Sequence, residues 1–359
     1  MTTSSPPPQP ALLCPICLDF IGWPEPPLFQ RVDDSEASRW EEVDLSGINN
    51  EVKYADARRR CYVRCPNPSF DTGEHFLPVS HRDHGDPIII GLVGRGQSGK
   101  THLLVAMMSE ALRAGLAPFG LELEPADEFR NLRFMRNVEK LAAGDRLDGT
   151  RGSIQDFAAY YVVRTRSGTS RPLVFFDVAG EDFMSHGNQG RNARFLLGAT
   201  ALMFVEDPEH AVPDWYPDHR SPDTQQNQAF AVALSRLRSR GDIRRIPVAV
   251  VVTKADELRY THPVDRWLRR YDTGPDSLTA FREESRDVYA FLHHYGAHPL
   301  LDVYDRFDRG TLHVVSATGS RADGNGYPRV RPMRVLRPLV ALLAMVGVVE
   351  DPAADGVGR

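Results

Sequence analysis

Short apolar segments recur along the chain, and most of them end at glycine or at polar residues. The segments with the length and branched side chains of buried strands are 88–93, 157–166, 170–177, 199–207, 246–253 and 311–316. Helical periodicity lies between and after them, at about 102–115, 127–143, 225–240, 276–308 and 335–349. This order of strands and helices predicts an α/β fold with a mostly parallel sheet.

The last apolar segment, VLRPLVALLAMVGVV, could suggest a membrane. It is shorter than the roughly 18 residues of a spanning helix, so we expect it to pack on the sheet and predict no membrane span. The N-terminal sequence MTTSSPPPQP reads as a disordered tail, residues 1–10. It lacks the basic start and long apolar run of a signal peptide, so we expect a cytoplasmic protein.

Composition adds broad limits. The 359 residues are 42% apolar and 25% charged, which suits a globular protein with one large core and room for a small second domain. The net charge of -5 indicates no polyanionic partner, so we do not expect nucleic acid binding. Lysine is rare, with four among 43 basic residues, so Lys100 and Lys254 stand out because both lie in motifs.

The four cysteines form two close pairs, Cys14 with Cys17 and Cys61 with Cys65. Two such pairs can present four thiolates to one zinc ion, which predicts a zinc ribbon over residues 11–80. The 43 residues between the pairs exceed the usual spacing, so we expect a charged insertion that loops out, either without regular structure or with a short helix of its own. Disulfides are the alternative, in an oxidising compartment. The histidines that could replace a ligand, but that we expect to be solvated, are His75, His81 and His84.

The segment PIIIGLVGRGQSGKT, residues 87–101, reads as a strand, a glycine-rich loop and the start of a helix. Its loop matches the phosphate-binding pattern GxxxxGK[ST]. Backbone N–H groups of such a loop wrap phosphates, Lys100 would reach the outer phosphates, and Thr101 would offer a hydroxyl to Mg²⁺. The loop does not choose between ATP and GTP. Its predicted nucleotide-binding residues are Gly94, Arg95, Gly96, Gln97, Ser98, Gly99, Lys100 and Thr101.

The segment SRPLVFFDVAGED, residues 170–182, reads as an apolar strand that ends in Asp177, with Gly180 three residues later. A carboxylate there would lie beside the Mg²⁺, and the N–H of Gly180 could approach the γ-phosphate. Thr150, in a polar segment before the preceding strand, could bind Mg²⁺ or be an ordinary turn residue. Glu181 could act on the attacking water or be a solvated loop residue.

The segment RIPVAVVVTKADE is a buried strand that ends in Thr253, Lys254 and Asp256. A carboxylate at Asp256 can accept both donors on one edge of guanine, and adenine offers no such pair. The stem of Lys254 would lie over the base while Thr253 holds the loop. A further strand leads into a turn that would contact the guanine carbonyl through its backbone, formed by Ser316, Ala317 and Thr318.

Through GRGQSGKT, DVAG, TKAD and SAT, the chain resembles the TRAFAC class of P-loop GTPases. The cysteine ribbon and the DVAGEDF sequence resemble, more narrowly, the bacterial double-GTPase families associated with conflict and signalling systems. The class implies a P-loop three-layer sandwich over residues 86–350, with six strands. It also implies Mg²⁺-dependent GTP binding, slow hydrolysis and a protein effector. Residues 351–359 are then expected to be a flexible tail.

The resemblance leaves three functions open. The first is a GTPase switch that is slow or activated by a partner, because Glu181 stands where Ras-like enzymes place a glutamine. The second is a P-loop ATPase, in which the TKAD and SAT matches arise by chance. The third is a scaffold that binds GTP without turnover.

Overall fold

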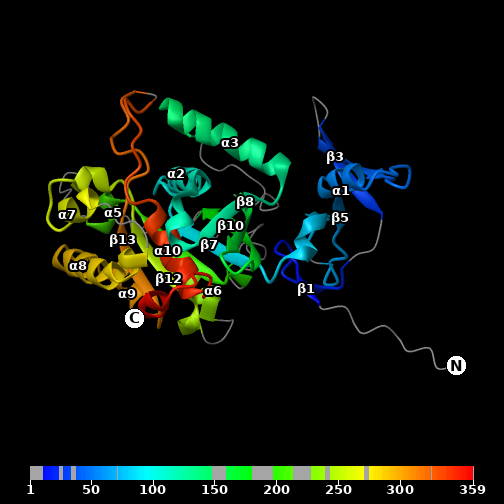
Figure 1. Cartoon of the computed structure of the whole chain (residues 1–359). Coiled ribbons are helices and arrows are strands. Elements are labelled where there is room, and N and C mark those ends of the chain that lie inside the picture. The colour runs from blue at the N-terminus through cyan, green and yellow to red at the C-terminus, as the bar shows by residue number, and fades with distance from the viewer. Residues whose placement is uncertain are drawn as a thin grey trace.

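The computed structural model describes residues 11–23, 27–33, 38–70, 72–147, 159–179, 196, 198–212, 228–238, 243–270, 275–324 and 326–358. A seven-stranded sheet forms the centre of the larger part, with the N-terminal module, residues 11–80, to one side (Figure 1). The expected tail at residues 1–10 lies outside the described residues, as do Thr150, Gly180 and Glu181.

The strands of the central sheet, from one edge to the other, are β13 Gly310–Val314, β12 Val248–Val252, β11 Ala201–Glu206, β7 Ile88–Gly94, β10 Ser170–Ala179, β9 Ala159–Thr165 and β8 Leu121–Pro125. The five strands from β13 to β10 pair in parallel, whereas β9 and β8 pair antiparallel. Six of these strands were predicted. The seventh, β8, has the sequence LELEP, and its two glutamates and its proline suit an edge strand that other chains should not extend.

The predicted helical regions are confirmed, and 276–308 divides into two helices. The α-helices of the larger part are α2 Lys100–Glu110, α3 Glu128–Ala143, α5 Pro208–Ala211, α6 Gln228–Arg238, α7 Val264–Arg269, α8 Ala280–His294, α9 His298–Tyr304 and α10 Leu336–Met345. Short 3-10 segments include η9 Ala255–Leu258 and η11 Pro352–Gly356. In the part of the chain that the structure describes, no helix is both long and apolar enough to cross a bilayer.

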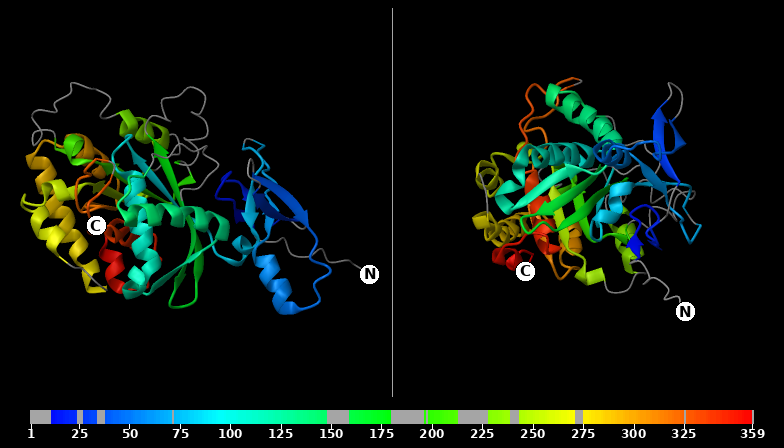
Figure 2. Two further views of the ribbon diagram at one scale, coloured as in Figure 1. Left: turned by 90° about the horizontal axis from the view of Figure 1, so that it is seen from above. Right: turned by 45° about the vertical axis from the view of Figure 1, so that its right-hand side comes forward.

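Alternate residues of the sheet strands face two apolar cores, as expected for a sheet covered on both faces. Helices α2, α3 and α10 contribute to one core, and α6 and α9 contribute to the other. The second core also contains Cys14, Cys17 and Ile21 of the N-terminal module. The module is therefore packed onto the larger part through apolar side chains, and both further views keep it on the side away from α7 and α8 (Figure 2).

The described residues of the N-terminal module form two small antiparallel sheets and one α-helix. These elements are β1 Leu12–Leu13, β2 Phe20–Ile21, β3 Leu28–Asp33, β4 Ser38–Val43, α1 Glu51–Arg59, β5 Tyr62–Arg64 and β6 Phe76–Pro78. The charged insertion was expected to loop out, either without regular structure or with a short helix of its own. The structure has that helix, α1, and another part of the insertion forms β4, which pairs with β3 in a hairpin. Trp40 of β4 packs the hairpin against β6, because its ring stacks on Phe76 with 4.2 Å between the centroids.

The C-terminal residues also differ from the expectation of a flexible tail. Ala354 and Val357 are buried, and the carbonyl of Gly358 accepts a hydrogen bond from the N–H of Gly310 at 3.1 Å. Arg309 donates to the carbonyl of Val357 at 3.0 Å. These contacts hold the C-terminal residues in place, where they cover one end of the core around α10 beside the edge strand β13.

Candidate functional site

The glycine-rich loop lies between the end of β7 and the start of α2, as predicted. A Cβ at Gly94 would lie 2.3 Å from the carbonyl oxygen of Val205 on β11, so only glycine fits there. Gly99 has φ of 86°, in the left-handed region that glycine tolerates best. The loop thus turns the chain sharply and leads directly into the N-terminus of α2, where backbone N–H groups can bind an anion.

Lys100 is buried, and its ammonium group lies within the curve of this loop. It donates to the carbonyl of Gly94 at 2.9 Å and to that of Arg95 at 2.6 Å. Thr101 follows directly at the start of α2. The arrangement concentrates one full positive charge and a helix N-terminus in the same small space, which favours an anion.

Asp177 lies near the carboxyl end of β10, in register with Leu92 on the neighbouring strand β7. Two residues later, Ala179 is paired with Gly94, the first residue of the loop. Parallel pairing therefore brings Asp177 to the sheet edge that carries the phosphate loop and Thr101. A hydroxyl and a carboxylate are oxygen ligands of the kind that Mg²⁺ takes.

The TKAD segment begins where β12 ends and lies beside the phosphate loop. The hydroxyl of Thr253 is buried and donates to the carbonyl of Ser98 at 2.6 Å, which joins the two loops. Lys254 has φ of 48°, an uncommon left-handed conformation for a lysine. This conformation turns the chain so that Asp256 follows within η9.

The carboxylate of Asp256 is 5% exposed and accepts a hydrogen bond from the hydroxyl of Ser316. The Ser316 oxygen in turn accepts from the N–H of Gly319 at 2.8 Å. The SAT turn predicted after β13 therefore lies directly against the TKAD loop. Ala317 and Thr318 are buried in the same turn. Three predicted segments thus meet at one edge of the sheet, although they are far apart in the sequence.

A group of charged side chains that was not predicted from the sequence lies at the end of β11, between the two loops. Glu206 and Asp207 are both buried, and Asp207 lies 3.2 Å from the ammonium of Lys254. The Nδ1 atom of His210 lies 2.6 Å from Asp207, and its Nε2 atom lies 2.5 Å from the guanidinium of Arg95. The signal was present as FVED at the end of an apolar strand, but it matches no common motif.

The two buried carboxyl groups, Glu206 and Asp207, differ in their ionisation state. Burial and the neighbouring Asp207 raise the pKa of Glu206 to about 8, so this carboxyl is neutral at pH 7. Burial would also raise the pKa of Asp207, but Lys254 and His210 outweigh it and lower this pKa. Asp207 is therefore the charged partner of Lys254.

A second group of potential ligands lies in the N-terminal module, formed by Cys14, Cys17, Cys65 and His75. Their ligand atoms all lie within 4.8 Å of one another. The Cys17 and Cys65 sulfurs are 3.8 Å apart, which matches the edge of a tetrahedron with bonds of about 2.3 Å. All four cysteines of the chain are free thiols, so the disulfide alternative is wrong for this structure.

Backbone groups around this cluster favour the metal-binding forms of its ligands. The N–H groups of Ile16 and Asn67 each point at a cysteine sulfur, Cys14 and Cys65 respectively, at 3.4 Å. The Nδ1 atom of His75 lies 2.7 Å from the carbonyl oxygen of Gly73, which leaves Nε2 facing the sulfurs. The residues present therefore fit a tetrahedral zinc ion.

Cys61 was predicted as the fourth ligand, and this prediction is wrong. Cys61 immediately precedes β5 and Cys65 immediately follows it, so an extended strand separates their Cα atoms by roughly 13 Å at about 3.3 Å per residue. The Cys61 thiol donates instead to the carbonyl of Ala57 at 3.3 Å. His75, ten residues after Cys65, supplies the fourth ligand atom of the cluster.

Of the three histidines expected to be solvated, two are buried. His75 belongs to the cluster. His81 lies between the Leu13 carbonyl oxygen, at 3.2 Å, and the Tyr160 hydroxyl of β9, at 2.8 Å. His84 is half-buried against Ser170.

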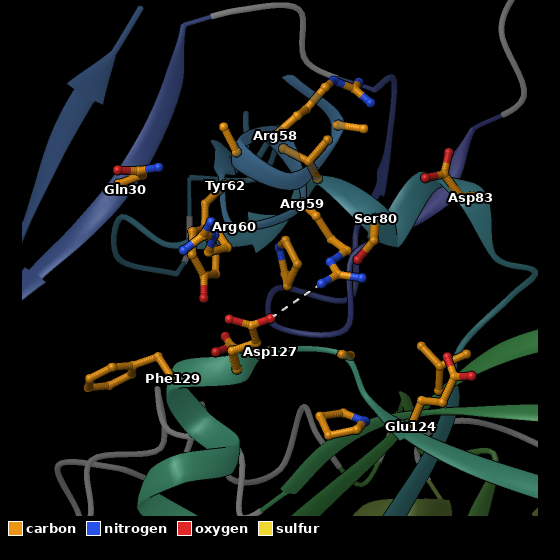
Figure 3. A pocket seen from close by; sticks show the side chains of 18 of the residues that line it. Gln30, Arg58, Arg59, Arg60, Tyr62, Ser80, Asp83, Glu124, Asp127 and Phe129 are labelled. Atoms are coloured by element: carbon orange, nitrogen blue, oxygen red, sulfur yellow. Dashed lines mark ion pairs between the residues drawn. The ribbon is translucent and has the colours of Figure 1, made fainter. Parts of the chain in front are cut away.

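A hollow of about 1160 Å³ lies between the N-terminal module and the start of α3 (Figure 3). Its walls carry charges of both signs, and Arg59 forms an ion pair with Glu128 across it at 3.8 Å. The Arg31 guanidinium lies 3.9 Å above the ring of Phe129. None of the predicted nucleotide-binding or metal-binding residues lines this hollow, which we interpret as part of the junction between the module and α3.

One protein-family model matches the chain, that of Double-GTPase 2, over residues 88–287. This region covers the phosphate loop, Asp177 and TKAD, and it is more than half of the chain. No curated protein matches the chain.

Several solved structures are similar at low identity. Bacterial selenocysteine-specific elongation factor EF-Sec is 16% identical over 64% of this chain and 26% of its own, with a TM-score of 0.29. Sup35 complexed with GDP is 14% identical over 68% and 42% of the two chains, with a TM-score of 0.30. The signal recognition particle receptor complex SRb-GTP/SRX from Chaetomium thermophilum is 17% identical over 68% and 95%, with a TM-score of 0.31. The chain thus spans less than half of the first two.

Proposed function

Because the chain belongs to the Double-GTPase 2 family, we propose that it binds GTP and GDP at the carboxyl edge of the sheet and hydrolyses the terminal phosphate of GTP. The observation that carries this proposal is the placement of Asp256. Its buried carboxylate lies in the loop that Thr253 ties to the phosphate loop. A carboxylate there selects guanine over adenine, because it can accept from N1–H and from the exocyclic amine together.

The roles of the remaining residues follow from their positions. Lys100 would neutralise the outer phosphates, and the loop from Gly94 to Gly99 would wrap them with backbone N–H groups. Thr101 and Asp177 would hold Mg²⁺, with Thr150 as a further oxygen ligand. When bound, the ion neutralises charge on the phosphates. Gly180 would sense the γ-phosphate, and Glu181 in place of glutamine would make hydrolysis slow or dependent on a partner.

We propose in addition that the N-terminal cluster binds zinc in a structural role. Three thiolates and one imidazole complete a tetrahedron and leave no open position for a substrate. The output of the switch would pass through a protein effector, in bacterial signalling or conflict systems and in the cytoplasm.

The decisive experiment for the nucleotide changes Asp256→Asn. Xanthine carries a carbonyl where guanine carries the exocyclic amine, and an asparagine amide can accept from N1–H while it donates to that carbonyl. We expect the variant to lose affinity for GTP by at least about 100-fold and to gain affinity for xanthosine triphosphate. Fluorescent nucleotide analogues in competition with GTP, ATP and xanthosine triphosphate would measure this.

Glu257→Gln is the matched control, because Glu257 lies next to Asp256 but pairs with Arg321 at 2.8 Å. It should leave GTP affinity unchanged. Preference of the wild-type chain for ATP would contradict guanine selection and favour an ATPase. Phosphate release under single-turnover conditions tests hydrolysis, and no release over hours would favour a GTP-binding scaffold.

A further inference from the structure

The charged group at the end of β11 is not explained by the proposed roles. Asp207 is 3% exposed and divides its two oxygens between two partners. One oxygen lies 3.2 Å from the ammonium of Lys254, and the other lies 2.6 Å from the ring of His210. It also caps the short helix α5, by accepting from the N–H of His210 at 3.2 Å. Asp207 therefore connects Lys254 to the end of β11, the strand that lies between TKAD and the phosphate loop.

Lys254 needs such a partner because its own side chain is long and only partly covered. The side chain is 41% exposed, and Asp207 is the ion-pair partner of its ammonium among the described residues. A lysine that is free to rotate loses rotamer entropy when it is fixed against a ligand. A partner that holds it before binding removes part of that loss.

The same group reaches the phosphate loop through Arg95. The Arg95 guanidinium lies 2.5 Å from Nε2 of His210 and 3.5 Å from the carboxyl of Glu206. A chain of contacts therefore runs from the second residue of the phosphate loop, through His210 and Asp207, to Lys254. It lies on the side of the two loops that faces β11.

We propose that Asp207 is a positioning residue for guanine nucleotide binding, which holds the Lys254 ammonium so that the aliphatic stem is ready to cover the base. This inference rests on the proposed function. It assigns to β11 a role in recognition that the motifs on β7 and β12 do not include.

A metal site is the competing interpretation, because ligand atoms of Glu206, Asp207 and His210 lie within 4.8 Å of one another. Two cations already occupy this place, since Lys254 pairs with Asp207 and Arg95 lies beside Glu206 and His210. A divalent ion would be brought against both positive charges. The pairing seen in the structure therefore favours the positioning role.

The test uses the full-length chain and a fluorescent GDP analogue. Asp207→Asn keeps the shape of the side chain and the helix cap, since asparagine is a good N-cap residue, but it removes the charge. We expect the affinity for GDP to fall about tenfold, with a melting temperature close to that of the wild type. Asp207→Glu, which keeps the charge, should retain most of the affinity.

The result that separates positioning from a structural role is a double-mutant cycle. In a Lys254→Met background, Asp207→Asn should cause no further loss of affinity, because the group through which it acts has been removed. Asp308→Asn, which breaks a surface pair with Arg244 at 2.9 Å, is the matched control and should have no effect.

An Asp207→Asn loss that persists in full beside Lys254→Met would overturn the inference, as would wild-type affinity in the single variant. If the wild-type chain bound no guanine nucleotide, the proposed function would fail and this inference with it. A wild-type chain that binds GDP normally while the cycle shows no coupling would overturn the role of Asp207 alone.

Discussion

The nucleotide site and the cysteine–histidine cluster are both built from short spaced motifs, but they were predicted with unequal success. In the nucleotide site, the phosphate loop and TKAD each lie within one strand end and the turn after it. In the cluster, Cys14 and Cys17 share a tight turn, but Cys61 and Cys65 stand at opposite ends of a strand. A spacing identifies a site only when the backbone between its residues takes the conformation that the motif assumes.

The two regions are also connected. The cysteines of the cluster belong to the same apolar core as Leu196 and Ala199, which precede β11. Leu18, next to Cys17, packs so closely on Gly198 that a Cβ there would lie 2.4 Å from its methyl carbon. A metal bound by the cluster would therefore stabilise residues next to the sheet as well as the module.

The largest effect should come from the ligands of the cluster. Cys65→Ser should reduce zinc from about one ion per chain to near zero and lower stability by several kcal/mol, because metal binding contributes directly to folding. Metal analysis of the purified chain and thermal unfolding measure both quantities. Cys61→Ser is the matched control, since this thiol lies outside the cluster, and it should keep its zinc. Equal zinc loss in both variants would restore the original assignment of Cys61.

A smaller effect is expected from pH at the nucleotide site. The pKa of Glu206 is raised to about 8 by burial and by Asp207, against the pull of Arg95 and Lys100. A carboxyl with a raised pKa stabilises the fold below its unfolded pKa, near 4.5, and this stability is lost as pH rises toward 8. Each pKa unit corresponds to about 1.4 kcal/mol.

Glu206→Gln should therefore flatten the decline of the melting temperature between pH 5 and pH 8, and make the variant more stable than wild type at pH 8. Thermal unfolding across this range gives the comparison. Glu139→Gln, at an exposed position on α3, should reproduce the wild-type profile. Parallel profiles for Glu206→Gln and the wild type would show that Glu206 is ionised in the fold.

The smallest effect should come from the contact between the module and the sheet. Gly198→Ala places a methyl group against Leu18, and overpacking of this kind costs about 1 to 3 kcal/mol. Leu18→Ala should relieve the clash, so the double variant should melt higher than Gly198→Ala alone. Zinc content should stay constant in all three variants. Additive effects of the two substitutions on the melting temperature would show that Leu18 of the module does not pack against Gly198.

The sequence by itself determined the strands and turns of the nucleotide site and most of its residues. Gly94, Lys100, Thr253 and Asp256 lie where the motifs place them, because each motif includes the turn that sets its geometry. The six predicted strands were found because buried strands are continuous apolar runs. The edge strand β8 escaped prediction, since its alternating glutamates carry little apolar signal.

Tertiary structure alone decided the contacts between segments that no motif joins. His75 replaced Cys61 because a strand, β5, and not a turn, separates Cys61 from Cys65. Asp207 came to lie against Lys254 because β11 runs between β7 and β12. Local spacing can specify a turn, but the neighbours of a side chain across a sheet depend on strand order, which a single segment does not contain.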